Sequence, residues 1–283
     1  MTTRAHDETG PAGLLRRRLA DDPSRPLVTY YDDAAGERVE LSARTFDNWV
    51  AKTANFLVDG LGAEPGTRVV LAAPPHWQSA VWLMACWSAG LVAEPVDPDA
   101  VRARGGLEAG EPSGPSAPYI LAAAEEVLDL VAADAGAEEI VGLSLHALGG
   151  PLAHCPPGVI DYAVEVRGHG DRFVAGPEAA PDAPALTVTK TTLTGASLVE
   201  EARATAAKWG LDARDRVLVD MSFATLDGLL ASLLAPLASG ASVIIQRNFD
   251  KAALDRRVTV EHVTAVAGLP GWIDESGSLH RLV

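Results

Sequence analysis

An internal repeat is the feature of this sequence that most constrains its fold. Residues 193–249 follow the pattern of residues 41–97: an amphipathic helix, a Gly-Leu turn, an apolar strand that begins near Arg-Val, a largely uncharged helix, a glycine turn and a second apolar strand. Fully apolar strands joined by a helix indicate parallel pairing in a sheet that is covered on both faces. The repeat therefore predicts an α/β fold made of two repeated subdomains with mostly parallel sheets.

The matching positions are mostly residues that start or stop an element. Ser42 suits the N-cap of a helix that we predict over about 43–58, because its hydroxyl can accept a bond from a free backbone N–H. Glycine is common just past helix ends, since it tolerates positive φ. The matched pairs are Gly60-Leu61 with Gly210-Leu211, and Gly90 with Gly240.

The segments around the repeat set the expected domain boundaries. Residues 26–42 alternate in polarity around Asp-Asp-Ala-Ala-Gly and indicate a β-hairpin. Residues 98–117 and 173–184 are rich in glycine, proline and alanine, which is typical of loops or linkers. We expect a first α/β subdomain over 1–183, with the hairpin and a linker, and a second, truncated subdomain over 184–283.

Charge and composition argue against several classes of partner. The chain has 23 Lys+Arg and 38 Asp+Glu, and a net charge of −15 disfavours binding to nucleic acid or to an anionic membrane. Residues 228–245 are uncharged, but Pro236 and a Ser-Gly pair interrupt them, so we predict no membrane span. With two cysteines and no apolar leader at residues 1–10, we expect a cytoplasmic protein.

A polar stretch after the strand predicted over 184–189 is the best candidate for an anion site. It holds one of the chain's four lysines, and the cofactor-binding candidates are Thr189, Lys190, Thr191, Thr192 and Thr194. A strand end that leads into a helix N-terminus offers free N–H groups and a favourable dipole. The alternative, which we favour, is that Thr194 caps the helix with Ser197 at its third position, and that Lys190 is a solvated turn residue.

Histidines and cysteines give weaker signals. His76 also follows a strand and opens a helix, so it could touch a ligand, although a lone histidine at a helix start is more often structural. His154 and Cys155 are adjacent rather than spaced as metal ligands, and no second cluster accompanies them. We predict no metal site, and the sequence contains no Walker loop or nucleophile elbow.

Several ordered blocks resemble the AMP-forming acyl-adenylating family, which includes acyl-CoA synthetases and peptide-synthetase adenylation domains. They are residues 66–69 (GTRV), 94–98 (EPVDP), 215–217 (DRV) and 259–270 (TVEHVTAVAGLP), within a similarity over roughly 14–272. The resemblance implies the fold of that family's large N-terminal domain without the small C-terminal domain. The chain looks like a truncated, degenerate member, similar to small actinobacterial proteins of this type.

The same resemblance implies that the family's chemistry is lost. The family holds the β- and γ-phosphates of ATP in a Ser/Thr/Gly loop that ends in Pro-Lys-Gly and that should follow the strand over 184–189. Most of that loop has no counterpart here, and only Lys190 could stand for its lysine. Residues 222–224 (SFA) replace an aromatic-histidine turn, and the later motifs have no counterpart before residue 283. Each lost electrostatic group normally contributes several kcal/mol to the transition state.

Three functional hypotheses follow from the sequence. The first is a pseudo-enzyme, a non-catalytic relative of AMP-dependent ligases that binds a ligand or regulates, with no cofactor beyond a weak nucleotide or CoA-type ligand of unknown identity. The second is an interaction or oligomerisation subunit that forms a homo-oligomer or binds a protein partner through apolar surface. The third is a divergent acyl-adenylate or acyl-CoA-related enzyme with its chemistry relocated to Lys190, His76 or Asp220.

Overall fold

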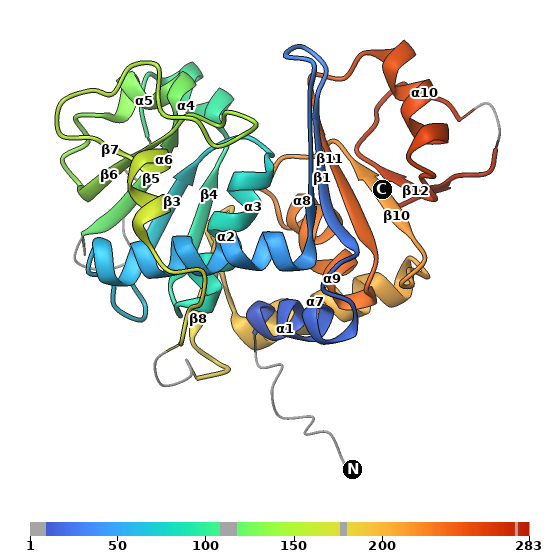
Figure 1. The fold of residues 1–283 in the computed structure, drawn as a ribbon, viewed down its shortest axis with the longest axis horizontal. Helices are drawn as coiled ribbons and strands as arrows, with labels where there is room; N and C mark the ends of the chain where they lie inside the picture. Colours follow the sequence, from blue (N-terminus) through green and yellow to red (C-terminus); the bar gives the residue numbers. More distant parts are fainter. Residues whose placement is uncertain (1–9, 108–117, 176–179, 275–276, 283) are drawn as a thin grey trace.

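Two mostly parallel sheets stand side by side, with helices around and between them (Figure 1). The computed structural model describes residues 10–107, 118–175, 180–274 and 277–282. Helix α3 contacts strands of both sheets and packs against α2, so these two helices lie between the sheets. The predicted α/β class with mostly parallel sheets is confirmed.

The first sheet has the strand order β13-β12-β10-β11-β1-β2. Neighbouring strands are parallel except β1 and β2, which form the hairpin predicted over 26–42. The strands are β13 (His280–Arg281), β12 (Ala265–Ala267), β10 (Arg216–Val219), β11 (Ser242–Arg247), β1 (Pro26–Asp32) and β2 (Glu37–Ser42).

The second sheet has the strand order β7-β6-β5-β3-β4-β8-β9, and only β8 and β9 pair antiparallel. Its central strands β3, β4 and β5 are the apolar strands expected in the first repeat unit and after it. The strands are β7 (Ile160–Asp161), β6 (Ala137–Leu143), β5 (Tyr119–Ala124), β3 (Arg68–Ala72), β4 (Val92–Val96), β8 (Pro184–Val188) and β9 (Thr191–Thr194).

The helices are mostly short and begin at side chains that cap them. The α-helices are α1 (Pro11–Asp21), α2 (Ala43–Asn55), α3 (Trp77–Ser88), α4 (Pro98–Arg104), α5 (Glu125–Val131), α6 (Tyr162–Glu165), α7 (Gly195–Lys208), α8 (Leu226–Leu229), α9 (Ala235–Ser239) and α10 (Lys251–Val260). Two π-helical segments (Phe56–Gly60, Leu230–Leu234) and a 3₁₀ turn (Val166–Gly168) complete them. Residues 98–104, which we expected to be a loop, form α4 because Asp97 caps it and Pro98 stands at its first turn; residues 108–117 of that predicted linker lie outside the described residues.

The predicted repeat is confirmed in the order of the elements. The first unit is α2, β3, α3 and β4, and the second is α7, β10, the run from α8 to α9, and β11. Ser42 and Thr194 occupy equivalent N-caps, and their side chains accept bonds from the backbone N–H groups of Thr45 and Ser197, at 3.1 Å each. Because the two units have N-cap residues at matching positions, the repeat can be recognised from the sequence.

The two repeat units exchange their N-terminal hairpins. The β1–β2 hairpin precedes the first unit but pairs with β11 of the second, through Val28 and Val243 among others. The β8–β9 hairpin precedes the second unit but pairs with β4 of the first, at Ala93 and Leu186. Division of the chain into domains over 1–183 and 184–283 stays a prediction, yet both sheets contain strands from each side of that division.

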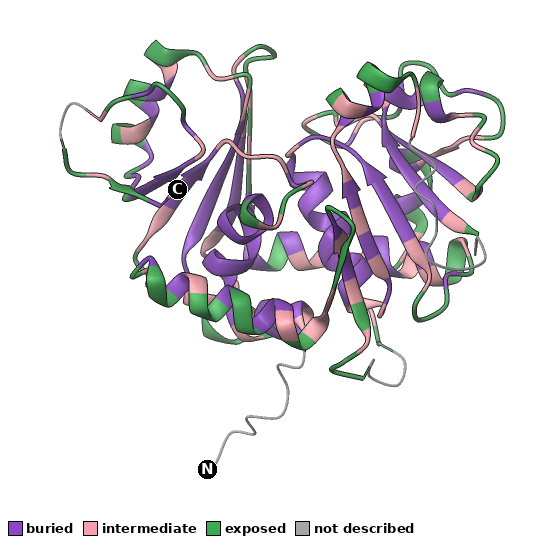
Figure 2. Cartoon of the chain, turned by 180° about the vertical axis from the view of Figure 1, so that it is seen from behind, coloured by how far each residue is buried: buried purple, intermediate pink, exposed green. Residues whose placement is uncertain are grey.

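The core is concentrated around α3 and the central strands. Every residue from 77 to 87 is buried, and Trp77, Trp82 and Trp87 belong to one large cluster. A smaller cluster that includes Leu218, Ile244 and Leu254 lies between α10 and the outer face of the first sheet. Figure 2 shows buried residues along the strands of both sheets and exposed residues on the outer helix faces. No helix within the described ranges is both long and apolar enough to cross a membrane.

Candidate functional site

The carboxyl ends of the parallel strands form the first place to look for a site, because α/β sheets bind ligands at that edge. Asp97 follows β4 of one sheet and Ser222 follows β10 of the other. The Ser222 hydroxyl donates to Asp97 Oδ2 at 2.9 Å, while Asp97 Oδ1 accepts the N–H of Asp99 at 2.9 Å. Both carboxylate oxygens are therefore engaged in holding the edges together and starting α4.

Residues 189–194 do not form the expected strand-to-helix loop, and that part of the prediction is wrong. The chain turns back after β8 through Thr189 and Lys190, whose φ angles are +47° and +65°, and continues as β9. A two-residue turn with positive φ at both positions has the type I′ geometry that matches strand twist. This turn was not predictable from the sequence, because such turns usually contain asparagine and glycine and this one contains neither.

The structure separates the residues of the predicted anion site. Thr191 and Thr192 pair back onto β8, and Thr194 caps α7 in a capping box with Ser197, as the favoured alternative predicted. Lys190 lies in the turn before β9 and Thr194 at the far end of that strand, about 13 Å apart at 3.3 Å per residue. Lys190 therefore does not lie beside the N-terminus of α7; whether these residues bind an anion stays a prediction.

His76 is a buried structural residue in this arrangement. It is 1% exposed, and its Nδ1 accepts the backbone N–H of Gln78 at 3.1 Å, which caps α3. The Tyr30 ring meets the imidazole edge-on, with centroids 4.2 Å apart. Burial, aided by the positive charge of Arg247, lowers the pKa of His76 to about 3. The imidazole is therefore neutral near pH 7, and its Nε2 is buried without a partner among the described residues.

Asp220 is the perturbed acid at this edge. It follows β10, and burial raises the pKa of its carboxyl to about 6. Its backbone N–H donates to Ala267 O at 3.1 Å, and no described residue bonds to its carboxylate. Gly268 crosses directly over it, since a Cβ on Gly268 would lie 2.3 Å from Asp220 O. The backbone approach at this point requires glycine.

A second ion-paired contact ties the sheets together at the same edge. Arg247 at the end of β11 donates to both carboxylate oxygens of Glu126 in α5, at 3.0 and 2.8 Å. Arg102 of α4 reaches the same carboxylate at 2.8 Å. These charges are satisfied by each other. The residues that the structure describes contain no group of three or more His, Cys, Asp or Glu side chains that could hold a metal ion.

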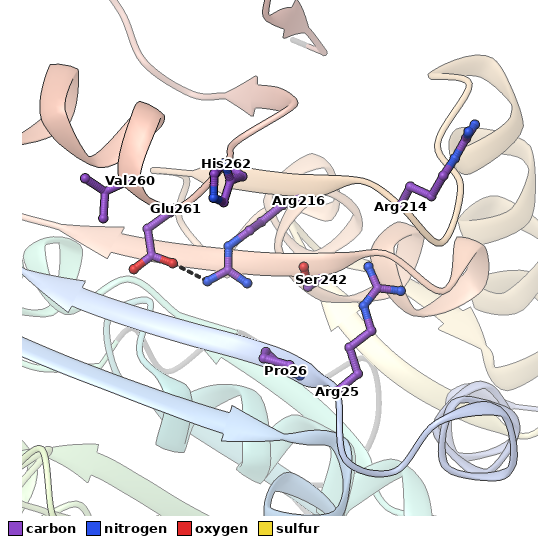
Figure 3. A pocket seen from close by; sticks show the side chains of 8 residues that line it. All are labelled: Arg25, Pro26, Arg214, Arg216, Ser242, Val260, Glu261 and His262. Atoms are coloured by element: carbon purple, nitrogen blue, oxygen red, sulfur yellow. Dashed lines mark hydrogen bonds and ion pairs between the residues drawn. The ribbon is translucent and has the colours of Figure 1, made fainter.

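A pocket of about 270 Å³ lies at the opposite edge of the first sheet, where β1, β10 and β11 begin (Figure 3). Residues from these strands, from the loops before them and from the end of α10 surround it. They include Arg25, Arg214, Arg216, Ser242, Glu261 and His262.

One carboxylate organises the wall of this pocket. Glu261 accepts bonds from Arg216 at 2.5 Å, from Arg38 at 3.0 Å and from the hydroxyl of Tyr31. Burial alone would raise the pKa of Glu261, but these hydrogen bonds outweigh it and lower the pKa to about 2. Glu261 is therefore ionised at neutral pH and holds the Arg216 guanidinium in a fixed position.

Comparison with known proteins places the chain in a family. A protein of Mycobacterium tuberculosis (strain ATCC 25618 / H37Rv), described as a TIGR03089 family protein, is 40% identical over 253 residues. That similarity spans 89% of this chain and 96% of the relative. The chain belongs to the TIGR03089 family.

This TIGR03089 family chain also matches the family model of AMP-binding enzymes over residues 15–107. Its fold resembles the N-terminal domain of FACL13 from Mycobacterium tuberculosis, with a TM-score of 0.68 at 16% identity. It also resembles an acyl-CoA synthetase of Brucella canis, with a TM-score of 0.72 at 16% identity. These matches cover 92% of this chain in each case, but only 63% and 47% of the two solved chains. The resemblance to acyl-CoA ligase N-terminal domains inferred from the sequence is confirmed for the fold.

Sequence reasoning missed the contacts that join the two sheets of this TIGR03089 family protein. Asp97 was noticed only as part of a motif, and its partner Ser222 lies 125 residues away. The arginine pocket was also missed, because Arg25 and Arg216 come from distant segments. The sequence offered one signal: Arg216 stands at the start of an apolar strand, in the Asp-Arg-Val block, where an arginine needs either solvent or a polar partner.

Proposed function

We propose that this protein is a non-catalytic relative of AMP-dependent ligases, a pseudo-enzyme that binds a ligand or regulates rather than adenylates. The observation that carries the proposal is the two-residue turn at Thr189 and Lys190. In the family that the sequence resembles, the phosphate loop would stand at this place.

The turn offers little to a triphosphate. Thr187 pairs with Thr192 and Val188 with Thr191, so the ladder occupies the neighbouring backbone groups. Only the N–H groups of the two turn residues are left to face a phosphate, and neither residue is the glycine that lets a backbone wrap around one. A loop of this length cannot surround the β- and γ-phosphates.

Pyrophosphate exchange tests the proposal directly. We expect no exchange of labelled pyrophosphate into ATP with any acid from a panel of aliphatic, aromatic and amino acids, because the two-residue turn leaves too few backbone N–H groups to hold the β- and γ-phosphates. An active acyl-CoA synthetase in the same buffer is the control. Calorimetry with ATP, AMP, an acyl-adenylate analogue and CoA then asks whether a ligand still binds. Sustained exchange with any acid would overturn the proposal.

Asp220 is the observation that favours the divergent-enzyme alternative. A carboxyl group with a pKa of about 6 at the carboxyl end of a strand is a typical feature of acid–base sites. If exchange is found, loss of that activity in Asp220→Asn with unchanged folding would support this alternative. Asp220 suits that role better than His76, which is buried and caps a helix.

The interaction-subunit alternative gains no support from the described surface. Its large exposed apolar side chains come from six separate segments, and none is adjacent in sequence to another: Leu130, Leu148, Val164, Val174, Val260 and Ile273. A dimer would still be visible by light scattering, and this alternative stays a prediction.

A further inference from the structure

The pocket at the amino-terminal edge of the first sheet concentrates positive charge in an acidic protein. The chain carries a net charge of −15, yet Arg25, Arg214 and Arg216 line this pocket and Glu261 is its only acidic lining residue. Arg214 forms an ion pair with Asp212 at 2.7 Å. The other two arginines therefore decide what the pocket can bind.

Arg216 presents a fixed guanidinium with donors to spare. Its Nη2 donates to Thr29 Oγ1 at 3.0 Å and to Glu261 at 2.5 Å, and it lies 3.5 Å from a second carboxylate, that of Glu40. Its Nε is buried and finds no partner among the described residues, and no bond is formed by its Nη1 with any of them. The side chain is only 14% exposed. A guanidinium held on one side and free on the other is pre-organised for an incoming acceptor.

Arg25 is unpaired as far as the structure describes the chain. Its backbone is anchored, because its N–H donates to Asp22 Oδ1 at 3.2 Å and its carbonyl accepts from Ala43 N at 3.1 Å. Its guanidinium makes no hydrogen bond or ion pair to a described residue. In Figure 3 the Arg25 and Arg216 guanidinium groups lie on either side of Ser242, and that of Arg216 points toward Glu261. The two arginines thus border the pocket on either side of Ser242, whose buried hydroxyl lies 3.4 Å from Asp215 O.

We propose that this pocket binds a small oxyanion, the phosphate or carboxylate group of a soluble metabolite, between Arg25 and Arg216. The volume of about 270 Å³ is below the usual range for drug-sized ligands, and it suits a short phosphate ester or dicarboxylate rather than a whole nucleotide. Glu261 does not oppose the anion strongly, since both of its oxygens are already bonded to donors.

The inference does not depend on the proposed function. The pocket lies where β1, β10 and β11 begin, whereas the absent phosphate loop would stand where β8 ends. Loss of oxyanion binding would leave the pyrophosphate exchange result untouched, and the reverse also holds.

Calorimetric titration of the full chain with inorganic phosphate, pyrophosphate and succinate, at constant ionic strength, tests the site. We expect saturable binding of at least one of these ions, weakened roughly tenfold in Arg25→Gln, which removes one charge-assisted hydrogen-bonding group. Because the Arg25 guanidinium makes no hydrogen bond or ion pair to a described residue and has only a longer-range attraction to Asp212, this change should alter the unfolding temperature little. Arg172→Gln removes a charge from an exposed residue outside the pocket lining and should bind as the wild type does.

Arginine side-chain NMR supplies a second readout. The Nε–H signals of Arg25 and Arg216 should shift with the same saturation curve as the calorimetry, and that of Arg172 should not. Phosphate and succinate arms show which oxyanion is preferred. Absence of saturable binding of all three ions, or equal binding by wild type and Arg25→Gln, would overturn the proposal.

Discussion

At the scale of single residues, several polar side chains at the carboxyl ends of the parallel strands hold the structure together. His76 caps α3 and is neutral, and Asp97 caps α4 while it accepts a bond from Ser222. Asp220 keeps a raised pKa because burial, not a partner, surrounds it. The sequence indicated that these polar residues stand at strand ends. It did not indicate how deeply they are buried or which residues they contact, because the neighbouring side chains come from distant segments.

Gly268 gives a prediction at this scale. It has a φ of +70°, and an added Cβ would lie 2.2 Å from Met221 Cγ and 2.3 Å from Asp220 O. We expect Gly268→Ala to lower the free energy of unfolding by at least about 2 kcal/mol, through strain and collision with backbone. Urea unfolding measures it.

Gly271 is the matched control for this prediction. Its φ is +75°, but nothing lies within 4 Å of an added Cβ. Gly271→Ala should therefore cost only the backbone term, about 1 kcal/mol. Equal losses in the two variants would show that the close approach over Asp220 does not exist.

At the scale of elements, the β8–β9 hairpin replaces what the sequence suggested was a loop. The strand over 184–189 and the cap at Thr194 were predictable, because an apolar run and a threonine three residues before a serine are local signals. The turn was not, because Thr189 and Lys190 adopt positive φ without the residues that usually mark it. A local pattern predicts a type I′ turn only when the turn contains residues, such as asparagine and glycine, that favour positive φ.

The protein should become more stable when the two turn residues are replaced by residues that favour the φ angles of the turn. We expect Thr189→Asn combined with Lys190→Gly to raise the free energy of unfolding by about 1 kcal/mol, because both new residues accept positive φ. Thermal unfolding at neutral pH measures it. Lys208→Gly, in the last turn of α7, is the control and should lower stability by up to about 1 kcal/mol. A less stable double variant would contradict the hairpin.

At the scale of the whole molecule, the exchange of hairpins joins the two repeat units. The repeat itself was predictable from glycines, caps and apolar strands, all of which are local. The exchange was not, because nothing in residues 26–42 indicates that β1 will pair with β11 rather than with β4. Strand partners depend on which edges are free when the chain closes, and no local pattern in the hairpin carries that information.

Separated halves test this arrangement. We expect residues 1–183 and residues 184–283, expressed apart, to give poorly dispersed NMR spectra, because each sheet would lose a hairpin supplied by the other half. Co-expression should restore a dispersed spectrum and a complex of both pieces. Well-dispersed spectra from both isolated halves would instead support two independent domains over those ranges.

The exchange also sets an order of events during synthesis. Val28 of β1 pairs with Val243 of β11, so a ribosome must add the whole intervening chain before the first hairpin finds its place. At 5–20 residues per second that delay is roughly 10 to 40 seconds. Throughout it, the β1 edge that β11 will cover has unpaired N–H and C=O groups, which is the kind of edge that attracts other strands. The nascent chain is therefore most exposed to aggregation until its last third has been made.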